Sequence, residues 1–305
     1  MDTTAFDGLM PYLVPPNDQR HRLFHGRGKA IPALEWLTID RFSPVLMATL
    51  FRPQPADVIE QLAGILRQHL TALGCDALLF QHRYEDPARN ECVVGELPVT
   101  PYAKEAGLRY RLDFERGQNV GFFADMAPGR AWLKANAHDK SVLNLFSFTC
   151  SFSVAALAGG ARQVVNIDLS RAALALGEQN HRCNDIPTDC VHFLDHNIFR
   201  SWKKLHKLGR YDIIVMDPPS AQKGSFMVER DYGRVLAQLH RLLTPQADLL
   251  LCLNAPWLSL DWLEECVARH LPGAEKVHVL PVATGFVEQQ EPALKVVHYR
   301  YRRPE

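Results

Sequence analysis

The chain has 305 residues, of which 47% are hydrophobic, and its 34 Lys plus Arg balance its 34 Asp plus Glu. This length exceeds one average domain, so we expect a main domain with a smaller companion. The balanced charge excludes a protein that binds nucleic acid through a global basic excess, so any such binding must be local.

The seven cysteines include no Cys-x-x-Cys pair, which fits neither a disulfide framework nor a zinc site and predicts no metal centre. The first residues lack a cationic region followed by an apolar core, and no apolar run approaches the ~18 residues of a membrane span. We therefore expect a soluble, unexported protein of the reducing cytoplasm. Nothing in the sequence indicates an oligomeric state.

Residues 1–30 are polar and broken by prolines, which predicts an irregular arm that ends in the basic stretch RHRLFHGRGK. A solvated tail is the favoured reading of this charge, and an RNA-contacting arm is the alternative. Residues 31–118 predict a small α+β domain. Its expected helix repeats leucines at helical spacing after Asp57, which can cap the first turn, and its expected strands are EWLTIDRF, PVLMATLF, DALLFQHRY, ECVVGELPV and LRYRLDF.

Residues 119–305 alternate apolar strands with helical segments, which predicts a parallel sheet covered on both faces. The expected strands are SVLNLF, QVVNIDL, DCVHFLD, YDIIVMD and ADLLLCLN. The last two, KVHVLPV and ALKVVHYRYR, have no helix between them and a short glycine-containing loop, so they should form an antiparallel hairpin at a sheet edge. Such an edge is typical of Rossmann-like methyltransferases and not of dehydrogenases.

The loop after the first of these strands, Ser147-Phe148-Thr149-Cys150-Ser151, contains no glycine. Dinucleotide sites need glycines there because a pyrophosphate approaches the backbone closely, whereas S-adenosylmethionine (SAM) has no phosphate. The loop therefore favours SAM, and a plain packed turn is the alternative.

Two acids end the next two strands of the predicted sheet. Asp168 can accept both hydroxyl hydrogens of a ribose, and Ser170 is the expected cap of the following helix. Asp195 can accept from an adenine amino group, or it can cap a helix that starts near Asn197.

The fourth strand ends in Asp217-Pro218-Pro219-Ser220. Two prolines fix the backbone and remove two donors, which leaves carbonyl oxygens able to hold a planar amine. Methyl transfer requires alignment of a lone pair with the methyl group, and no strong general base.

These motifs resemble the class I SAM-dependent methyltransferases of bacterial large-subunit ribosomal RNA, a family of cytosine carbon-5 and guanine enzymes. GFFADMAPGR, NLFSFTCSFSVAALAGGARQVVNIDLS, YDIIVMDPPS and ERDYGRVLAQLHRLL carry the likeness, and RLFHGRGKAIPALEWLTIDRF resembles the family's small central module. Relatives commonly have two glycines in place of Cys150-Ser151. No PUA domain precedes the central module, so RNA docking is expected on the arm or on RSWKKLHKLGR.

The resemblance implies roles for individual residues. Asp125 and Arg130 would flank the methionine end of SAM, Phe146 to Thr149 would wrap it, and Asp217 with Pro218 would face the methyl group. Phe226 and Trp257 could stack a flipped base, with ordinary packing as the alternative. The expected cofactor-binding residues are Asp125, Arg130, Asn144, Phe146, Ser147, Phe148, Thr149, Asp168, Leu169, Asp195, His196 and Asp217. The expected catalytic residues are Asp217, Pro218, Pro219, Ser220 and Asn254.

Asn254 stands where the cytosine enzymes have a nucleophilic cysteine and the guanine enzymes an asparagine, which favours transfer to a nitrogen. Cys252 lies two residues earlier, inside an apolar strand, and leaves open a carbon-5 mechanism. The sequence thus predicts a SAM-dependent methyltransferase of RNA. Three alternatives stay open: a carbon-5 enzyme, a non-catalytic RNA-binding protein and a nicotinamide-dependent oxidoreductase.

Overall fold

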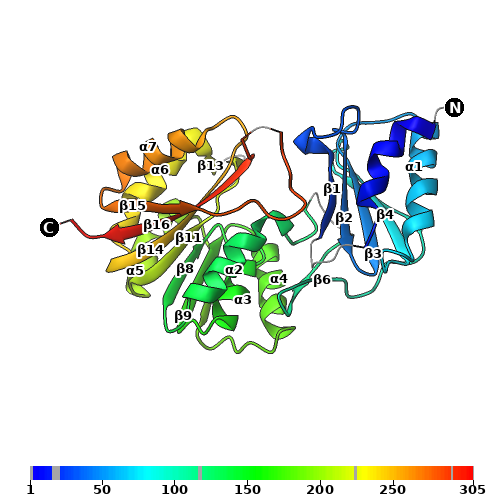
Figure 1. Ribbon diagram of the computed structural model, residues 1–305. Helices are drawn as coiled ribbons and strands as arrows, with labels where there is room; N and C mark the ends of the chain where they lie inside the picture. The colour runs from blue at the N-terminus through cyan, green and yellow to red at the C-terminus, as the bar shows by residue number, and fades with distance from the viewer. Residues whose placement is uncertain (1–2, 16–20, 116–118, 223–224, 290, 305) are drawn as a thin grey trace. The chain divides into compact units, whose positions relative to one another are not determined.

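The computed structural model describes residues 3–15, 21–115, 119–222, 225–289 and 291–304. Residues 1–2 and 16–20 of the predicted arm, and residues 116–118 at the predicted domain boundary, lie outside the described residues. The chain forms two compact units, the first from residues 1–125 with 283–290 and the second from residues 126–282 with 291–305 (Figure 1). The domain boundaries expected after residues 30 and 118 remain a prediction.

The first unit is built on a five-stranded sheet of order β1-β2-β3-β4-β5, in which only β3 and β4 are parallel. Leu62 and Leu66 of α1 are fully buried against the sheet, together with Phe6 and Leu9 of η1. The elements are η1 (Thr3–Tyr12), β1 (Arg22–His25), η2 (Gly26–Gly28), β2 (Leu37–Phe42), β3 (Val45–Leu50), α1 (Ala56–His69), β4 (Ala77–His82), β5 (Arg89–Val94), β6 (Tyr102–Glu105), β7 (Leu108–Arg111) and η3 (Ala124–Met126), whose last residue belongs to the second unit.

The predicted irregular arm contains regular structure, since η1 and β1 both fall within it. The sequence did not predict β1 because the strand has only four residues and two of them are basic. Its pairing with β2 depends on a residue distant in the sequence, since Arg22 Nε donates to Asp40 Oδ1 at 2.6 Å. The expected cap of α1 is also wrong. Pro55 occupies the N-cap position without a side-chain hydrogen bond, and Asp57 lies in the first turn, where its charge favours the helix dipole.

The second unit is a seven-stranded sheet of order β10-β9-β8-β11-β14-β16-β15. Its first five strands in this order are parallel, as predicted, and the final two form the predicted antiparallel edge. The strands are β8 (Ser141–Leu145), β9 (Gln163–Asp168), β10 (Val191–Asp195), β11 (Tyr211–Met216), β14 (Leu243–Asn254), β15 (Ala274–Val279) and β16 (Leu294–Arg302), with a small hairpin of β12 (Ala221–Gln222) and β13 (Phe226–Met227).

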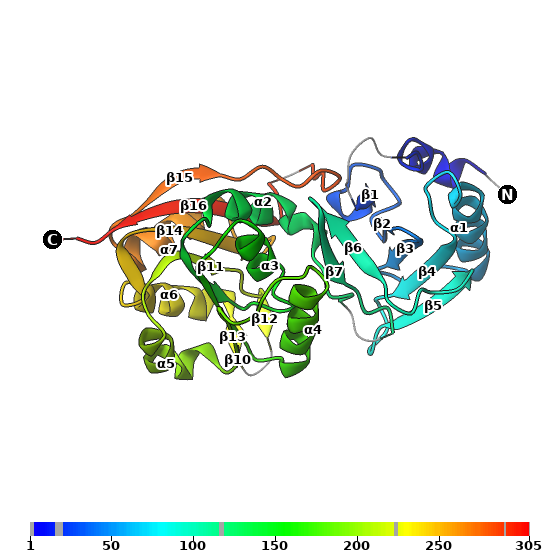
Figure 2. The same ribbon diagram turned by 90° about the horizontal axis from the view of Figure 1, so that it is seen from below.

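Helices cover both faces of this sheet, as Figures 1 and 2 show. Successive strand residues point to opposite faces, so Ile213 packs in a cluster with α2 and α3 whereas Ile214 packs in a cluster with α5, α6 and α7. The helices are α2 (Ala127–Asn136), α3 (Ser151–Ala158), α4 (Arg171–Arg182), η4 (Ile198–Arg200), α5 (Trp202–Lys207), α6 (Val228–Leu239) and α7 (Leu260–His270).

The connection between β15 and β16 is longer than the short loop expected from sequence. It runs through residues 280–293, and its part 283–290 belongs to the first unit. There Gln289 N donates to Gly28 O at 3.0 Å, and the Arg22 guanidinium lies 4.4 Å from the centre of the Phe286 ring. The path of this connection thus depends on contacts with residues far away in the sequence, which a local pattern does not predict. No described helix is long and apolar enough to cross a bilayer.

Candidate active site

The predicted site residues gather at the carboxyl edge of the parallel strands in the second unit. Asp195 and Asp168 are paired in register at the ends of β10 and β9. Leu145, the last residue of β8, is level with Ile167 on one side and with Met216 on the other. The loops that follow β8 and β11 therefore leave the sheet beside Asp168, at the crevice where open α/β sheets bind ligands.

The loop after β8 makes a tight path to α3 without glycine. Phe146, Phe148 and Cys150 all have positive φ, at 56°, 45° and 60°. A left-handed conformation costs a residue with a Cβ roughly 1–2 kcal/mol, so the surrounding structure must hold this shape. Sequence reasoning identified the absence of glycine, but it did not predict that the chain would adopt the glycine-like backbone regardless.

Asp168 is one of the groups that hold the loop. Its Oδ2 accepts from Phe148 N and its Oδ1 from Ser170 N, both at 2.8 Å. Ser170 is the N-cap of α4, as predicted, and its hydroxyl accepts from Ala173 N at 3.1 Å. A carboxylate has about four acceptor positions, so Asp168 keeps capacity for two ribose hydroxyls while the two amides fix its orientation.

Helix α4 packs against the same loop. Asn180 Nδ2 donates to Thr149 O at 2.8 Å, and both residues are buried. Gly177 lies so close that a Cβ on it would stand 2.6 Å from Cys150 Sγ. Burial raises the pKa of the Cys150 thiol, so this cysteine is an apolar packing group. Gly177 on α4 therefore leaves room for the side chain of Cys150 in the glycine-free loop.

A buried chain of hydrogen bonds runs beneath the loop. Asn144 Nδ2 donates to Asn166 Oδ1 at 2.9 Å, and Asn166 Nδ2 donates to Ser153 Oγ at 3.0 Å. The chain ends at His181, whose Nδ1 faces Gly177 O at 2.7 Å and whose Nε2 lies 2.9 Å from Ser153 Oγ.

The direction of these bonds fixes the state of the histidine. A carbonyl oxygen only accepts, so His181 Nδ1 carries a hydrogen and Nε2 accepts from the Ser153 hydroxyl. Burial lowers the pKa of His181, which agrees with a neutral ring. Asn144 was predicted to bind the cofactor, and its side chain is only 1% exposed. Asn144 therefore belongs to this series of buried hydrogen bonds. Any contact with a ligand would have to come through its buried Oδ1, which has no hydrogen-bond partner among the described residues.

The exit of β11 forms a rigid corner beside this loop. Asp217, Pro219 and Ser220 are half-buried and Pro218 is buried. Ser220 O accepts from Val228 N at 3.0 Å, which ties the corner to the start of α6.

Phe226 follows this corner, and its suggested role in stacking a base is wrong. Its side chain is 1% exposed and meets the Phe146 ring edge to face at 5.0 Å. The alternative of ordinary packing is correct, because β13 turns this side chain into the core.

The start of α6 carries an ion cluster that sequence reasoning missed. Asp231 has a fully buried side chain, and it accepts from Arg230 Nη2 at 2.6 Å, from Arg234 Nη1 at 2.5 Å and from Met227 N at 2.9 Å. The bonds from Arg230 are the main cause that lowers the pKa of Asp231 to about 2. The available signal was Asp231 in ERDYGR, with Arg230 directly before it and Arg234 three residues after it.

The end of β14 carries Asn254 and Cys252, the two residues considered for a role beside the methyl acceptor. Asn254 is exposed as the last residue of the strand, and Trp257 beyond it is 60% exposed, with its Nε1 donating to Glu229 Oε1 at 2.7 Å. Cys252 is fully buried in the apolar cluster with α2 and α3, and its carbonyl accepts from the Tyr232 hydroxyl at 3.0 Å. Asn254 therefore faces the solvent side of the edge and Cys252 does not.

The remaining predicted residues occupy varied positions. Asp195 Oδ1 lies 3.3 Å from His196 Nδ1, and Asn197 itself caps η4, so Asp195 is not needed as a cap. Leu169 is 42% exposed, whereas Arg130 is 1% exposed within α2. Asp125 is half-buried in η3, directly before α2.

The strand order, the antiparallel edge and the acids at the ends of β9 and β10 define the class of Rossmann-like methyltransferase folds. Within this class, residues 21–300 match the family of S-adenosylmethionine-dependent methyltransferases, and the chain belongs to that family.

Among the relatives, the chain is 28% identical over 239 residues to the ribosomal RNA large subunit methyltransferase I of Aeromonas hydrophila, covering 75% of this chain and 59% of that protein. It is 30% identical over 258 residues to the protein of the same name from Klebsiella pneumoniae, covering 81% and 63%. The chain thus spans less than two thirds of the length of these relatives.

Among solved structures, a SAM-dependent methyltransferase from Streptococcus mutans superposes with a TM-score of 0.84 at 22% identity, covering 97% of this chain and 78% of that one. A tRNA methyltransferase from M. jannaschii superposes with a TM-score of 0.61 at 14% identity, covering 88% and 72%. At these identities the likeness establishes the fold.

Proposed function

We propose that this chain transfers the methyl group of SAM to a ring or exocyclic nitrogen of a base in large-subunit ribosomal RNA. The observation that carries the proposal is the Asp168 carboxylate, oriented by Phe148 N and Ser170 N at 2.8 Å beside a glycine-free loop. The family match and the names of the relatives support the methyl donor and the RNA substrate.

The residues at the carboxyl edge fit the donor. Asp168 would hold the ribose hydroxyls and Asp195, paired with it in register, would accept from the adenine. The loop of residues 146–149 would wrap the methionine end with Asp125 and Arg130, and Asn144, Leu169 and His196 would complete the pocket. The absence of a pyrophosphate cradle supports SAM over a nicotinamide dinucleotide.

When bound, SAM supplies a methyl group on a positively charged sulfur. The chain's own residues then have to orient the acceptor. Asp217 and the carbonyls of the Pro218-Pro219 corner would accept from the hydrogens of a planar amine and so aim its lone pair. Asn254 would hold the base from the neighbouring strand, and the exposed Trp257 would stack on it.

The test is methyl transfer from labelled SAM to ribosomal RNA isolated from a strain that lacks the gene, followed by mass spectrometry of the nucleosides. A nitrogen-methylated base is expected, with no incorporation into RNA from the parent strain. A product of 5-methylcytosine would refute transfer to nitrogen. Salt-dependent RNA binding with no incorporation at saturating SAM would establish a non-catalytic protein instead.

We further propose the cytoplasm as the compartment of this reaction, because ribosomal RNA is the substrate. Among the described residues, no group of three or more His, Cys, Asp or Glu could hold a metal ion. The proposed chemistry needs only the donor, RNA and the residues named above.

A further inference from the structure

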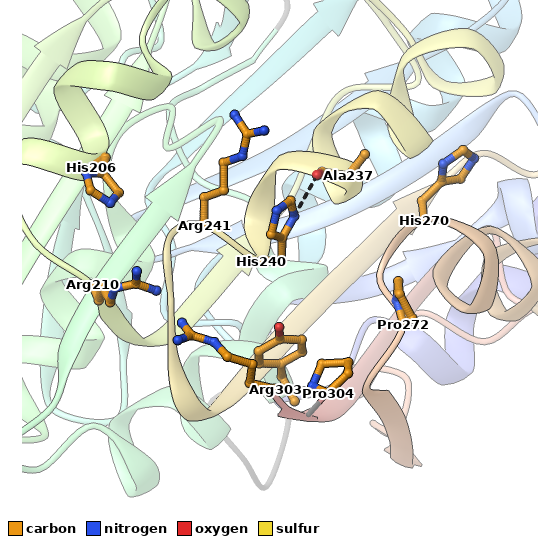
Figure 3. Close-up of a pocket in the computed structure, with 10 residues that line it drawn as sticks. His206, Arg210, Ala237, His240, Arg241, His270, Pro272, Arg303 and Pro304 are labelled. Atoms are coloured by element: carbon orange, nitrogen blue, oxygen red, sulfur yellow. Dashed lines mark hydrogen bonds between the residues drawn. The ribbon is translucent and has the colours of Figure 1, made fainter.

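A basic hollow of about 610 Å³ lies at the amino edge of the same sheet, where the parallel strands begin. Figure 3 shows the side chains that line it. They are His206, Arg210, Ala237, His240, Arg241, His270, Pro272, Tyr301, Arg303 and Pro304. Three arginines and three histidines thus line one hollow, and none of the described residues in its walls carries a carboxylate.

The hollow is assembled from four elements that end at this edge. His206 belongs to α5, His240 follows α6, His270 ends α7 and Arg303 follows β16. The His270 ring packs closely against α6, because a Cβ on Gly233 would stand 2.5 Å from it. Arg303 N donates to Pro245 O at 3.0 Å, so the backbone beneath the guanidinium is also held.

Within the described residues, some arginines of this unit form ion pairs with carboxylates, whereas the three arginines of the hollow do not. Arg162 and Arg234 form ion pairs with carboxylates. No ion pair links Arg210, Arg241 or Arg303 to a carboxylate within the described part of the chain. Arg210 Nη1 donates to Leu243 O at 3.2 Å, which orients its guanidinium and leaves its charge uncompensated. In a chain with no net charge, such a group of cations is a local feature.

The ends of the helices offer a purely structural reading of this charge. Basic residues stabilise helix C-termini, and His240 Nδ1 does donate to Ala237 O of α6 at 2.9 Å. That reading accounts for the histidines. It does not account for Arg303, which follows a strand.

We propose that this hollow binds phosphate groups. Guanidinium groups recognise phosphate oxygens through paired hydrogen bonds, and imidazole N–H groups can add further donors. Pro272, Pro304 and the buried Tyr301 provide the apolar part of the walls.

A phosphodiester of the RNA substrate is one source of the phosphate, and a free phosphate compound is the other. The RNA source rests on the proposed function, whereas phosphate binding as such does not. The predicted docking stretch, residues 200–210, contributes both His206 and Arg210. The six residues of β11 separate the two edges of the sheet by about 20 Å, so an RNA bound here would be held far from the reacting base.

The experiment uses the full chain and the double variant Arg241→Glu/Arg303→Glu, with Arg67→Glu on α1 as the matched control. Arg67 is likewise exposed, forms no ion pair with a carboxylate of the described residues and does not line the hollow. Inorganic pyrophosphate binding is measured by calorimetry, and ribosomal RNA binding is measured across a salt series. Binding of S-adenosylhomocysteine is measured in parallel and reports on the carboxyl edge.

For the double variant we expect pyrophosphate affinity to fall at least tenfold and S-adenosylhomocysteine affinity to stay unchanged. If RNA occupies the hollow, its affinity falls as well, and the slope of log affinity against log salt decreases by about 2, because two phosphate contacts are lost. A loss of pyrophosphate binding with RNA binding intact supports the free phosphate compound. Unchanged binding of both pyrophosphate and RNA would overturn the proposal, whatever the outcome of the methyl-transfer assay. Arg303→Lys, which keeps the charge without the paired donors, should lose less affinity than Arg303→Glu.

Discussion

The two edges of the seven-stranded sheet are built on different principles. At the carboxyl edge, Asp168 is oriented by two amides, and the loop after β8 rests on buried hydrogen bonds and on α4. At the amino edge, three arginines and three histidines from four elements line one hollow. The comparison teaches that one sheet can separate a site of fixed geometry, which the proposed reaction requires, from a cluster of positive charge, which would attract a polyanion.

The largest effect is expected from Asp168→Asn, which should disrupt the carboxyl edge alone. An amide cannot accept from both Phe148 N and Ser170 N, and it loses the charge that strengthens bonds to a ribose. Two charge-assisted hydrogen bonds contribute ~3 kcal/mol, so SAM affinity measured by calorimetry should fall about 100-fold. Asp189→Asn, at an exposed position before β10, is the control and should bind normally. Equal affinity in both variants would show that Asp168 only shapes the loop.

A second variant tests whether α4 shapes the loop. Gly177→Ala places a Cβ 2.6 Å from Cys150 Sγ, and overpacking of this kind costs about 1–3 kcal/mol. We expect lower SAM affinity and a lower free energy of unfolding in urea. Cys150→Gly suits the positive φ and removes the clash, so the double variant should recover more than half of both losses. Simple addition of the two single effects would contradict the proposed contact.

The buried histidine gives a pH dependence with a defined sign. The unfolded chain has an ordinary histidine pKa of about 6.5, and burial lowers the pKa of His181 in the folded protein. The unfolded state therefore binds more protons below pH ~6.5, so this contribution to stability is complete above that pH and is lost as the pH falls towards the lowered pKa. The loss reaches up to about 1.4 kcal/mol for each pH unit.

Urea unfolding of the wild type and His181→Gln between pH 7.5 and 5 would measure this contribution. Glutamine can still accept from the Ser153 hydroxyl but does not titrate, so its unfolding free energy should depend less on pH. His25 of the first unit, whose pKa burial lowers to about 3, contributes equally to both proteins and cancels in the difference. Identical slopes for the two proteins would mean that the ring is not held neutral.

The smallest effect is expected from Cys252→Ser. Cys252 is fully buried between the two edges, so it should contribute packing and no chemistry. We expect an unchanged rate of methyl transfer and a free energy of unfolding lower by about 1 kcal/mol, because a hydroxyl replaces a thiol in an apolar cluster. Complete loss of transfer by a folded variant would restore the carbon-5 mechanism.

The sequence predicted the parts of the molecule that depend on local pattern. Apolar strands with helical crossovers gave the parallel sheet and its antiparallel edge, and Ser170 was correctly assigned as a helix cap. It could not predict β1, the positive φ at Phe146, Phe148 and Cys150, or the packing of Gly177, because contacts distant in the chain determine them. The amino-edge hollow was hidden for the same reason: its residues are spread from position 206 to position 304.

The path of residues 283–290 has a consequence for how the protein is synthesised. The first compact unit includes this segment, which follows nearly all of the second unit in the chain. A ribosome therefore delivers the last piece of the N-terminal unit only when the sheet of the C-terminal unit lacks just its final strand, β16. The contacts of the first unit are therefore completed only after most of the second unit has been synthesised, and a protein truncated after residue 125 would lack the Phe286 ring that Arg22 covers.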